Sequence, residues 1–273
     1  MTSIPSLALN DGHSIPQIGL GTWPLDDDEA ERTVLTAFEL GYRHVDTARR
    51  YGNEAGVGRG VTSSGIPRED VFVTTKLDGE FQGGDKAVDG LRGSLELMGL
   101  DYVDLLLIHW PLPAREEYVS TWRTFAKLRD QGLVRSIGVS NFLPAHLDRL
   151  KAETGIVPAV NQIQLTPAIP RHAQRAYGLE HGIVTESWSP IKGILDESII
   201  VGIAEELDVT PAQVVLRWHV QNKLVAIPKS ADRGRLASNL DVFGFELSTE
   251  QMGLLTELDQ GPDAGVDSSV DGH

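Results

Sequence analysis

Four side chains able to hold or transfer a proton follow predicted strands in the first part of the chain. Asp46 closes the apolar stretch YRHVD, Tyr51 lies on the loop after it, and Lys76 and His109 end the runs VFVTTK and VDLLLIH. In a barrel of parallel strands, side chains at the carboxyl ends of the strands meet on the face that carries the active site. These residues therefore predict one proton-donating site formed by successive strand ends.

Tyr51 is the candidate acid of this site. The pKa of a free tyrosine is about 10, but an ammonium about 4 Å away, at an effective dielectric near 20, favours the phenolate by roughly 4 kcal/mol. Lys76 can provide that ammonium, and Asp46 can hold its charge. The pKa of Tyr51 is therefore expected to fall from about 10 towards about 7, with burial opposing the change. His109 can donate a hydrogen bond to a substrate carbonyl and orient it.

Each of these residues also has a purely structural alternative. Asp46 could cap a turn, Tyr51 could be a packing residue, Lys76 could pair with any of many acids, and His109 could be a satisfied interior histidine. Because all four stand on successive predicted strand ends, the pattern favours a functional site.

Alternating strands and helices position these residues. A hairpin is predicted at 7–15, with Asn10-Asp11-Gly12 as its turn, and a first short strand at 18–23. The other predicted strands are 43–46, 71–76, 103–108, 134–139, 158–162, 183–186 and 224–227. The predicted helices are 28–40, 54–63, 85–98, 117–130, 144–153, 170–180, 197–206, 211–221, 232–239 and 248–258. This pattern predicts a single closed (β/α)₈ TIM barrel within residues 1–259, with an open doubly wound sheet as the alternative and a mobile polar tail at 260–273.

Later strand ends carry amide, hydroxyl and indole groups. Ser140-Asn141 follows IGV, Asn161-Gln162 follows PAV, and Glu186 precedes Ser187-Trp188. Amide and hydroxyl groups suit recognition of a carboxamide, and an indole suits stacking on a flat ring. The alternative is that Asn and Ser are turn residues and that Trp188 belongs to the core.

A cationic cluster follows the last predicted strand. Lys229 and Ser230 precede a predicted helix that carries Arg233 and Arg235. Basic side chains at a helix N-terminus form an anion site, which barrels often place after their last strands. The alternative is a solvated basic turn. The sequence contains no Walker loop and no dinucleotide glycine fingerprint. It also contains no HExxH motif, so no metal site is predicted.

Composition limits the function classes. The 273 residues include 24 Lys and Arg against 39 Asp and Glu, a net charge of −15, which argues against nucleic acid or an anionic membrane as partner. The chain has no cysteine, which excludes thiolate chemistry and suits a cytoplasmic protein. No window approaches the roughly 18 apolar residues of a membrane span. A small molecule is therefore the expected partner.

The chain resembles the aldo-keto reductases, and among them the bacterial 2,5-diketo-D-gluconate reductase group. The resemblance covers residues 7–258, and its most specific motifs are GYRHVDTA, LLLIHWP and IPKS. It implies a TIM barrel whose N-terminal hairpin closes the bottom, NADPH (NADP) bound in extended form, and a monomer that acts on a small carbonyl compound.

The resemblance also implies roles for individual residues. The catalytic residues it implies are Asp46, Tyr51, Lys76 and His109, with Tyr51 as the proton donor. Those implied at the nicotinamide end of the cofactor are Ser140, Asn141, Gln162, Trp188 and Ser189. Those implied at the adenosine 2′-phosphate end are Lys229, Ser230, Arg235 and Asn239. Those implied to line the cofactor and substrate pocket are Thr22, Trp23 and Trp110.

The chain departs from the family pattern at four places. Asp78-Gly79 replaces a common Trp-Asn pair, Thr166 replaces a common histidine, and Ser238 replaces a glutamate that commonly contacts adenine. The loop after Pro190 is short. These departures alter a pocket wall, the adenine end of the cofactor site and the loop expected to clamp the cofactor.

The combined prediction is NADPH-dependent reduction of an aldehyde, a ketone or an α-dicarbonyl such as a diketo acid to an alcohol, by hydride transfer. Two alternatives remain open. One is an aldolase-type barrel in which Lys76 forms a Schiff base. The other is a reductase-like barrel that binds the nicotinamide cofactor as a regulatory or interaction protein with little turnover.

Overall fold

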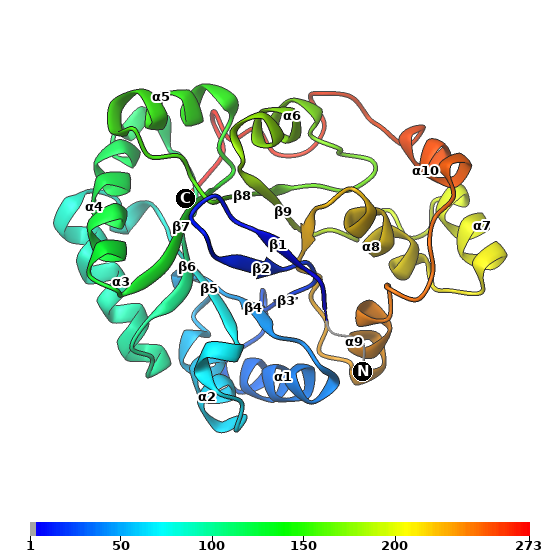
Figure 1. The fold of residues 1–273 in the computed structure, drawn as a ribbon, viewed down its shortest axis with the longest axis horizontal. Helices are drawn as coiled ribbons and strands as arrows, with labels where there is room; N and C mark the ends of the chain where they lie inside the picture. Colours follow the sequence, from blue (N-terminus) through cyan, green and yellow to red (C-terminus); the bar gives the residue numbers. More distant parts are fainter. Residues whose placement is uncertain (1–3) are drawn as a thin grey trace.

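Short aliphatic and β-branched runs of the chain form one cylinder of eight parallel strands with helices around it (Figure 1). The structure is a computed structural model that describes residues 4–273. The strands run in the spatial order β10-β9-β8-β7-β6-β5-β4-β3. They are β3 (Leu20–Gly21), β4 (His44–Asp46), β5 (Phe72–Leu77), β6 (Val103–Ile108), β7 (Val134–Ser140), β8 (Val160–Gln164), β9 (Val184–Trp188) and β10 (Val225–Ala226).

The two edge strands meet and close the cylinder. Ile18 forms a parallel bridge with Ala226. The Gly19 amide donates to the Ala226 carbonyl at 2.9 Å, and the Gly21 amide donates to the Pro228 carbonyl at 3.2 Å. The predicted (β/α)₈ barrel is therefore confirmed, and the open doubly wound sheet is excluded.

Helices cover the outside of the sheet, and several of them begin or end at capping residues. They are α1 (Asp27–Leu40), α2 (Glu54–Ser63), α3 (Gly84–Met98), α4 (Tyr118–Asp130), α5 (Pro144–Thr154), α6 (His172–His181), α7 (Ser198–Leu207), α8 (Pro211–Gln221), α9 (Arg233–Leu240) and α10 (Thr249–Thr256). Within residues 4–273, four short 3₁₀ turns complete them: η1 (Arg49–Tyr51), η2 (Arg68–Asp70), η3 (Gly79–Phe81) and η4 (Pro113–Arg115). For example, the Asp26 side chain accepts from the Glu29 amide at the start of α1, and Gly41 ends it in a left-handed conformation.

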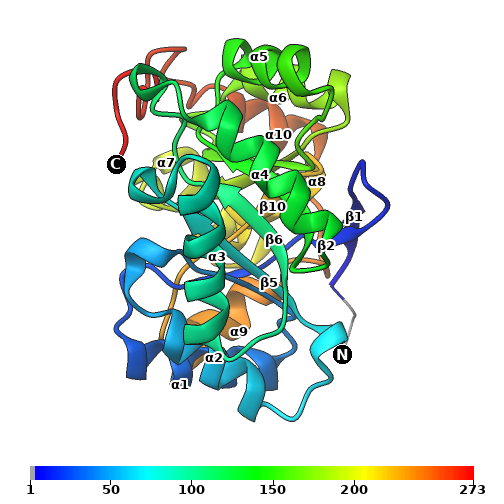
Figure 2. The ribbon, with the colours of Figure 1, turned by 90° about the vertical axis from the view of Figure 1, so that its left-hand side faces the viewer.

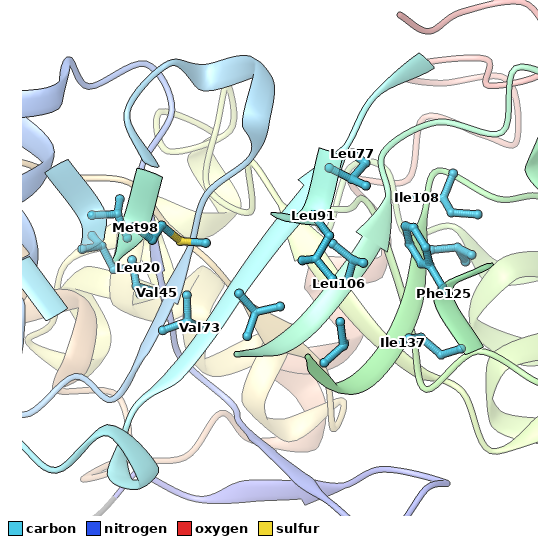
Figure 3. Close-up of a cluster of buried hydrophobic side chains, with 14 of the residues drawn as sticks. Leu20, Val45, Val73, Leu77, Leu91, Met98, Leu106, Ile108, Phe125 and Ile137 are labelled. Atoms are coloured by element: carbon cyan, nitrogen blue, oxygen red, sulfur yellow. The ribbon is translucent and has the colours of Figure 1, made fainter. Parts of the chain in front are cut away.

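The strands bury apolar side chains on both faces. Outward-facing side chains of β5 and β6, such as Val73 and Leu106, pack against Leu91 of α3 and Phe125 of α4 in the largest core cluster (Figure 3). Inward-facing residues form a second apolar layer at the N-terminal end of the barrel. That layer contains Leu9, Ile15, Phe72, Leu105, Leu107, Ala159, Val160 and Val225. Apolar packing on both faces explains why the strands appear as continuous hydrophobic runs.

An antiparallel hairpin of β1 (Ser6–Ala8) and β2 (Ser14–Pro16) covers that inner layer. Its Leu9 and Ile15 are buried in the layer. Figure 2 shows the hairpin at one end of the barrel and the C-terminus at the other. The hairpin therefore closes the end that lies opposite the strand ends bearing Asp46 and Lys76.

Glycines let α2 lie unusually close to its neighbours. A Cβ at Gly56 would stand 1.8 Å from the Asp27 carbonyl oxygen of α1, and one at Gly58 would stand 2.1 Å from the Met98 carbonyl oxygen of α3. This approach brings Glu54, at the first position of α2, to the Thr75 hydroxyl, which donates to it at 2.6 Å. The contact fixes the helix against β5 next to Lys76.

The segment 260–273 crosses the C-terminal face of the barrel. The Val266 amide donates to Gln164 Oε1 at 2.8 Å, Arg171 donates to the Val266 carbonyl at 2.9 Å, and the Gly79 amide donates to the His273 carbonyl at 3.1 Å. These bonds place His273 beside the site described below. The mobility of this segment stays a prediction. Across residues 4–273, every helix is too short or too polar to cross a bilayer.

Candidate active site

Lys76 is the centre of the predicted tetrad. Its side chain is fully buried, and its ammonium donates to Asp46 Oδ1 at 2.5 Å, to the Thr47 carbonyl at 3.0 Å and to the Tyr51 hydroxyl at 3.3 Å. All three donor positions of an ammonium are thus in use. Neighbouring strands β4 and β5 and the turn η1 bring these groups together, as the sequence predicts.

Burial and pairing act in opposite directions on this ion pair. Burial alone would lower the pKa of Lys76, but its surroundings, with the charge and hydrogen bond of Asp46 foremost, bring the pKa above its usual value. Burial raises the pKa of Asp46, and the charge and hydrogen bond of Lys76 oppose that rise. The ammonium therefore keeps its proton, and a charged amine is a poor nucleophile. This result disfavours the Schiff-base alternative.

The acidity of Tyr51 differs from the expectation. Burial raises the pKa of Tyr51, and the opposing charge of Lys76 does not overcome it. The expected fall towards about 7 is wrong, because the free-energy cost of removing the phenolate from water exceeds the stabilisation that one ammonium provides. Tyr51 therefore holds its proton at neutral pH, as a proton donor must.

His109 faces Tyr51 across the site. The two ring centroids lie 5.8 Å apart in an edge-on arrangement. Burial, together with the charge of Lys76, lowers the pKa of His109 well below its usual value, so the ring is neutral. A neutral imidazole carries one N–H donor. That N–H can donate a hydrogen bond to a substrate oxygen while the proton stays on the imidazole.

A second carboxyl group lies behind Asp46 in the barrel. The Gln162 side-chain nitrogen donates to Asp46 Oδ2 and to Glu186 Oε2, both at 2.8 Å. Gln162 and Glu186 face each other across β8 and β9. Since both amide hydrogens of Gln162 are used, Gln162 Oε1 is left as an acceptor, and within residues 4–273 no donor binds it. The pair Asp46 and Glu186 therefore orients the Gln162 amide.

Glu186 should make stability depend on pH. Burial raises the pKa of Glu186 to about 8, and the charge of Asp46 adds to the rise; the same group in an unfolded chain titrates near about 4.3. Between these values the native state holds a proton that the unfolded state has lost. The contribution of Glu186 to the free energy of unfolding therefore falls by about 1.4 kcal/mol per pH unit up to about pH 8 and is constant above it.

Glu186→Gln removes this titration. The free energy of unfolding of the wild type minus that of the variant should decrease between about pH 5 and about pH 8, as measured by denaturant titration. Glu205→Gln, at an exposed position of α7, is the control and should give a difference that hardly changes with pH. A constant difference for Glu186→Gln would mean that this carboxyl is already ionised in the native state.

The residues expected around a carboxamide are connected to one another. Asn141 Nδ2 donates to the His109 carbonyl and to Ser140 Oγ, both at 3.1 Å, and Asn141 Oδ1 accepts from the Trp188 indole N–H at 2.9 Å. Ser140 Oγ donates to the Gln162 carbonyl at 2.9 Å. Asn141 therefore fixes the Trp188 ring through the indole N–H. The side-chain amide of Asn141 is itself engaged with protein partners.

The cationic cluster is partly dispersed. Arg235 Nε donates to Ser230 Oγ at 3.3 Å, and Lys229 is exposed. Arg233 instead pairs with Glu39 of α1 at 2.7 Å. The first turn of α9 is capped by Asp232, whose side chain accepts from the Arg235 amide. Of the basic residues in this segment, Lys229 and Arg235 are thus the two placed for an anion.

One cavity of about 340 Å³ connects these groups on the C-terminal face. Its lining includes most of the predicted site residues: Thr22, Trp23, Asp46, Tyr51, His109, Trp110, Ser140, Asn141, Gln162, Trp188, Ser189 and Lys229. Lys76 lies behind Tyr51, and the remaining predicted residues outside the lining are Ser230, Arg235 and Asn239. A larger hollow of about 1020 Å³ lies between α6, α8 and α10, away from the tetrad. The smaller cavity is the candidate active site because it holds the titratable groups.

The cavity also contains residues that the sequence prediction missed. Those with ionisable side chains are Arg50, Lys192 and His273, and the others are Gly21 and Ile227. The His273 ring lies 4.9 Å from that of His109 and 5.8 Å from that of Trp110. Arg50 stands next to Tyr51 in the chain, a position that could have identified it. No local sequence signal marks His273, because it lies far from the tetrad in sequence.

The departures from the family pattern fall at different distances from this cavity. Asp78 is buried with its Oδ2 4.0 Å from Arg50 Nη1, and the Gly79 amide bonds the His273 carbonyl. Thr166 forms an isolated bridge with Ile169, and Ser238 lies 3.3 Å from the Thr210 hydroxyl. The pair at 78–79 therefore bears on the pocket directly.

Comparisons with known proteins agree with this geometry. Residues 17–260 match the model of the aldo/keto reductase family. The chain is 47% identical over 264 residues to 2,5-diketo-D-gluconic acid reductase B of a Corynebacterium species, covering 96% of this chain and 95% of that protein. It is 45% identical over 276 residues to methylglyoxal reductase DkgA of Yersinia pestis, covering 100% and 99% of the two chains.

A solved structure matches over the whole length. A point mutant of Gox0644 in complex with NADPH superimposes with a TM-score of 0.95 at 44% identity, covering 100% of both chains. The barrel, the buried Lys76–Asp46 pair beside Tyr51 and the family match over residues 17–260 lead to one conclusion: this chain is a member of the aldo/keto reductase family.

Proposed function

We propose that the protein reduces a small aldehyde, ketone or α-dicarbonyl compound to an alcohol with NADPH, and that Tyr51 donates the proton. The observation that carries the proposal is the contact of the Tyr51 hydroxyl with the fully buried ammonium of Lys76 inside the candidate cavity. The NADPH-bound neighbour and the methylglyoxal and diketogluconate reductases among the relatives support it. Small carbonyl compounds are therefore the proposed substrate class.

The residues present fit a nicotinamide cofactor. Gln162 Oε1 is an oriented acceptor on the cavity wall, suited to the N–H of a carboxamide, while Lys229 and Arg235 offer cations for a phosphate at the other end. Bound NADPH supplies the hydride. The Trp188 indole, fixed through Asn141, would cover a flat ring.

Tyr51 and its neighbours move the proton. The Tyr51 hydroxyl gives its proton to the substrate oxygen as negative charge develops there, and the Lys76 ammonium stabilises the tyrosinate that remains. Asp46 keeps that ammonium charged and in place. Neutral His109 donates a hydrogen bond to the same substrate oxygen and so fixes the carbonyl relative to Tyr51.

The direct test is NADPH oxidation, followed by absorbance, with a panel that includes methylglyoxal, simple aldehydes and 2-oxo acids. Turnover on at least one member is expected. NADPH binding without turnover on any member would favour the alternative of a regulatory barrel. We also propose a monomer in the cytoplasm, based on the family resemblance and on a chain without cysteine.

Lys229 and Arg235 should select NADPH over NADH. Replacing both by Ala is expected to raise the dissociation constant of NADPH about 30-fold, because two charged contacts to a phosphate contribute about 2 kcal/mol at partly exposed positions. The dissociation constant of NADH, which lacks the 2′-phosphate, should change far less. Fluorescence titration of both cofactors measures the two constants.

Arg233→Ala is the matched control, since its guanidinium pairs with Glu39. It removes a charge from the same helix and should leave the preference between the cofactors unchanged. Equal weakening of NADPH and NADH binding in the double variant would contradict the assignment of Lys229 and Arg235 to the phosphate.

A further inference from the structure

Arg50 is a basic side chain that lines the cavity directly beside the proposed proton donor. It precedes Tyr51 on η1 and shares the cavity with His109, Trp110 and His273. Its side chain is 54% exposed, so the guanidinium is open to solvent at the mouth of the cavity. A charged group in this position can contact a substrate whose carbonyl lies at Tyr51.

The guanidinium of Arg50 has donors to spare. Within residues 4–273 it donates no hydrogen bond, and its nearest carboxylate oxygen, Asp78 Oδ2, lies 4.0 Å from Nη1. That distance is too long for a hydrogen bond but short enough for the buried Asp78 to hold the guanidinium in place. A guanidinium carries five N–H donors in a fork that matches a carboxylate.

The adjacent arginine, Arg49, has a different environment, so a guanidinium on the cavity lining is particular to position 50. Arg49 lies 3.5 Å from Glu54 Oε2 and stacks over the Phe81 ring at 5.6 Å to its centroid. It therefore points away from the cavity, towards α2 and η3. Of this pair of arginines, only Arg50 lines the cavity.

The positive charge of Arg50 acts on the two histidines of the cavity, His109 and His273. Burial lowers the pKa of His273, and the charge of Arg50 contributes to the decrease; Arg50 also contributes to the low pKa of His109. Arg50 therefore brings positive charge to a cavity lining that also carries Lys192 and Lys229, in a chain whose net charge is −15. An anion is attracted to such a point, whereas a cation is repelled.

We propose that Arg50 forms a carboxylate subsite, so that the preferred substrates carry an anionic group near the reactive carbonyl, as 2-oxo acids and aldehyde acids do. The inference rests on the proposed reductase function and goes beyond it by naming the side chain that selects the substrate. The carboxylate binds the Arg50 fork while the carbonyl oxygen lies between Tyr51 and His109. Arg50 acts in recognition and takes no part in the proton transfer.

The test compares two substrates with the same aldehyde, 4-oxobutanoate and its methyl ester, in the wild type and in Arg50→Gln. The ratio of kcat/KM for the acid to that for the ester should fall about fivefold in the variant, as expected for one partly exposed charge pair. The decrease in kcat/KM for the acid should come mainly from a higher KM. Arg50→Lys keeps the positive charge but not the forked guanidinium. Its acid-to-ester ratio should lie between those of the wild type and Arg50→Gln.

Two controls separate recognition from general effects. Arg92→Gln removes an exposed arginine of α3 outside the cavity and should leave the acid-to-ester ratio unchanged. Raising the ionic strength from about 0.01 M to about 1 M shortens the screening length from roughly 30 Å to roughly 3 Å and should lower the ratio in the wild type more than in Arg50→Gln. A ratio that Arg50→Gln leaves unchanged, or an equal loss on both substrates, overturns the subsite.

A binding measurement keeps this test independent of turnover. Benzoate and benzamide are titrated calorimetrically into the purified chain, and Arg50→Gln should weaken benzoate more than benzamide. Absence of that difference overturns the carboxylate subsite. If the wild type reduces neither these aldehydes nor any member of the carbonyl panel, the proposed reductase function fails, and the calorimetric comparison still decides the assignment of Arg50.

Discussion

Tyr51→Phe is expected to lower kcat by about 10³-fold while the dissociation constant of NADPH changes by less than about threefold. Phe keeps the ring contacts with Trp23, at 5.2 Å between centroids, and with His109. It removes the hydroxyl that Lys76 contacts and that holds the transferable proton. Steady-state reduction of methylglyoxal and fluorescence titration of NADPH measure the two quantities.

Tyr177→Phe provides the matched control. This phenol lies on α6, where its hydroxyl donates to Asp148 at 2.7 Å, outside the cavity. Its removal should leave kcat close to the wild-type value. If Tyr51→Phe retained wild-type turnover, another group would have to supply the proton, and the assignment of Tyr51 would be wrong.

Lys76→Met should impair both stability and catalysis. Removing the ammonium leaves Asp46 buried without its counter-charge, and breaking a buried pair in this way costs about 3 kcal/mol of the free energy of unfolding. The tyrosinate also loses its stabilising charge, so kcat should fall at least about 100-fold. Denaturant unfolding and steady-state kinetics measure the two losses.

The double variant Asp46→Asn with Lys76→Met distinguishes the two effects. Both charges are then absent, so most of the lost stability should return, whereas the loss of kcat should persist. Recovery of turnover along with stability would mean that Lys76 serves the fold alone. Persistent instability in the double variant would mean that the carboxylate is held by groups other than Lys76.

The barrel and the core of the tetrad could be predicted because they depend on local patterns. Apolar runs of strand length between amphipathic helices identify parallel strands, and the predicted strand 71–76 lies within one residue of β5 at each end. In a parallel barrel, residues that end successive strands must meet. The proximity of Asp46, Tyr51 and Lys76 follows from that geometry without knowledge of any contact.

The features that were not predicted depend on burial and long-range register. The direction of the Tyr51 pKa depends on how completely the ring is removed from water, which the spacing of residues does not reveal. The bridge from Asp46 through Gln162 to Glu186 requires the register of β8 against β9. His273 reaches the cavity only through the path of the final segment, which has no periodic pattern.

The meeting of β3 and β10 has a consequence for ligand binding. These two strands have only two residues each, and a few hydrogen bonds join their segments, whereas β6 and β7 pair along most of their length. The cavity wall contains Gly21 and Thr22 from one side of this seam and Ile227 and Lys229 from the other. A cofactor lying there would contact both sides of this short junction, so its binding energy would also stabilise the closed ring of strands.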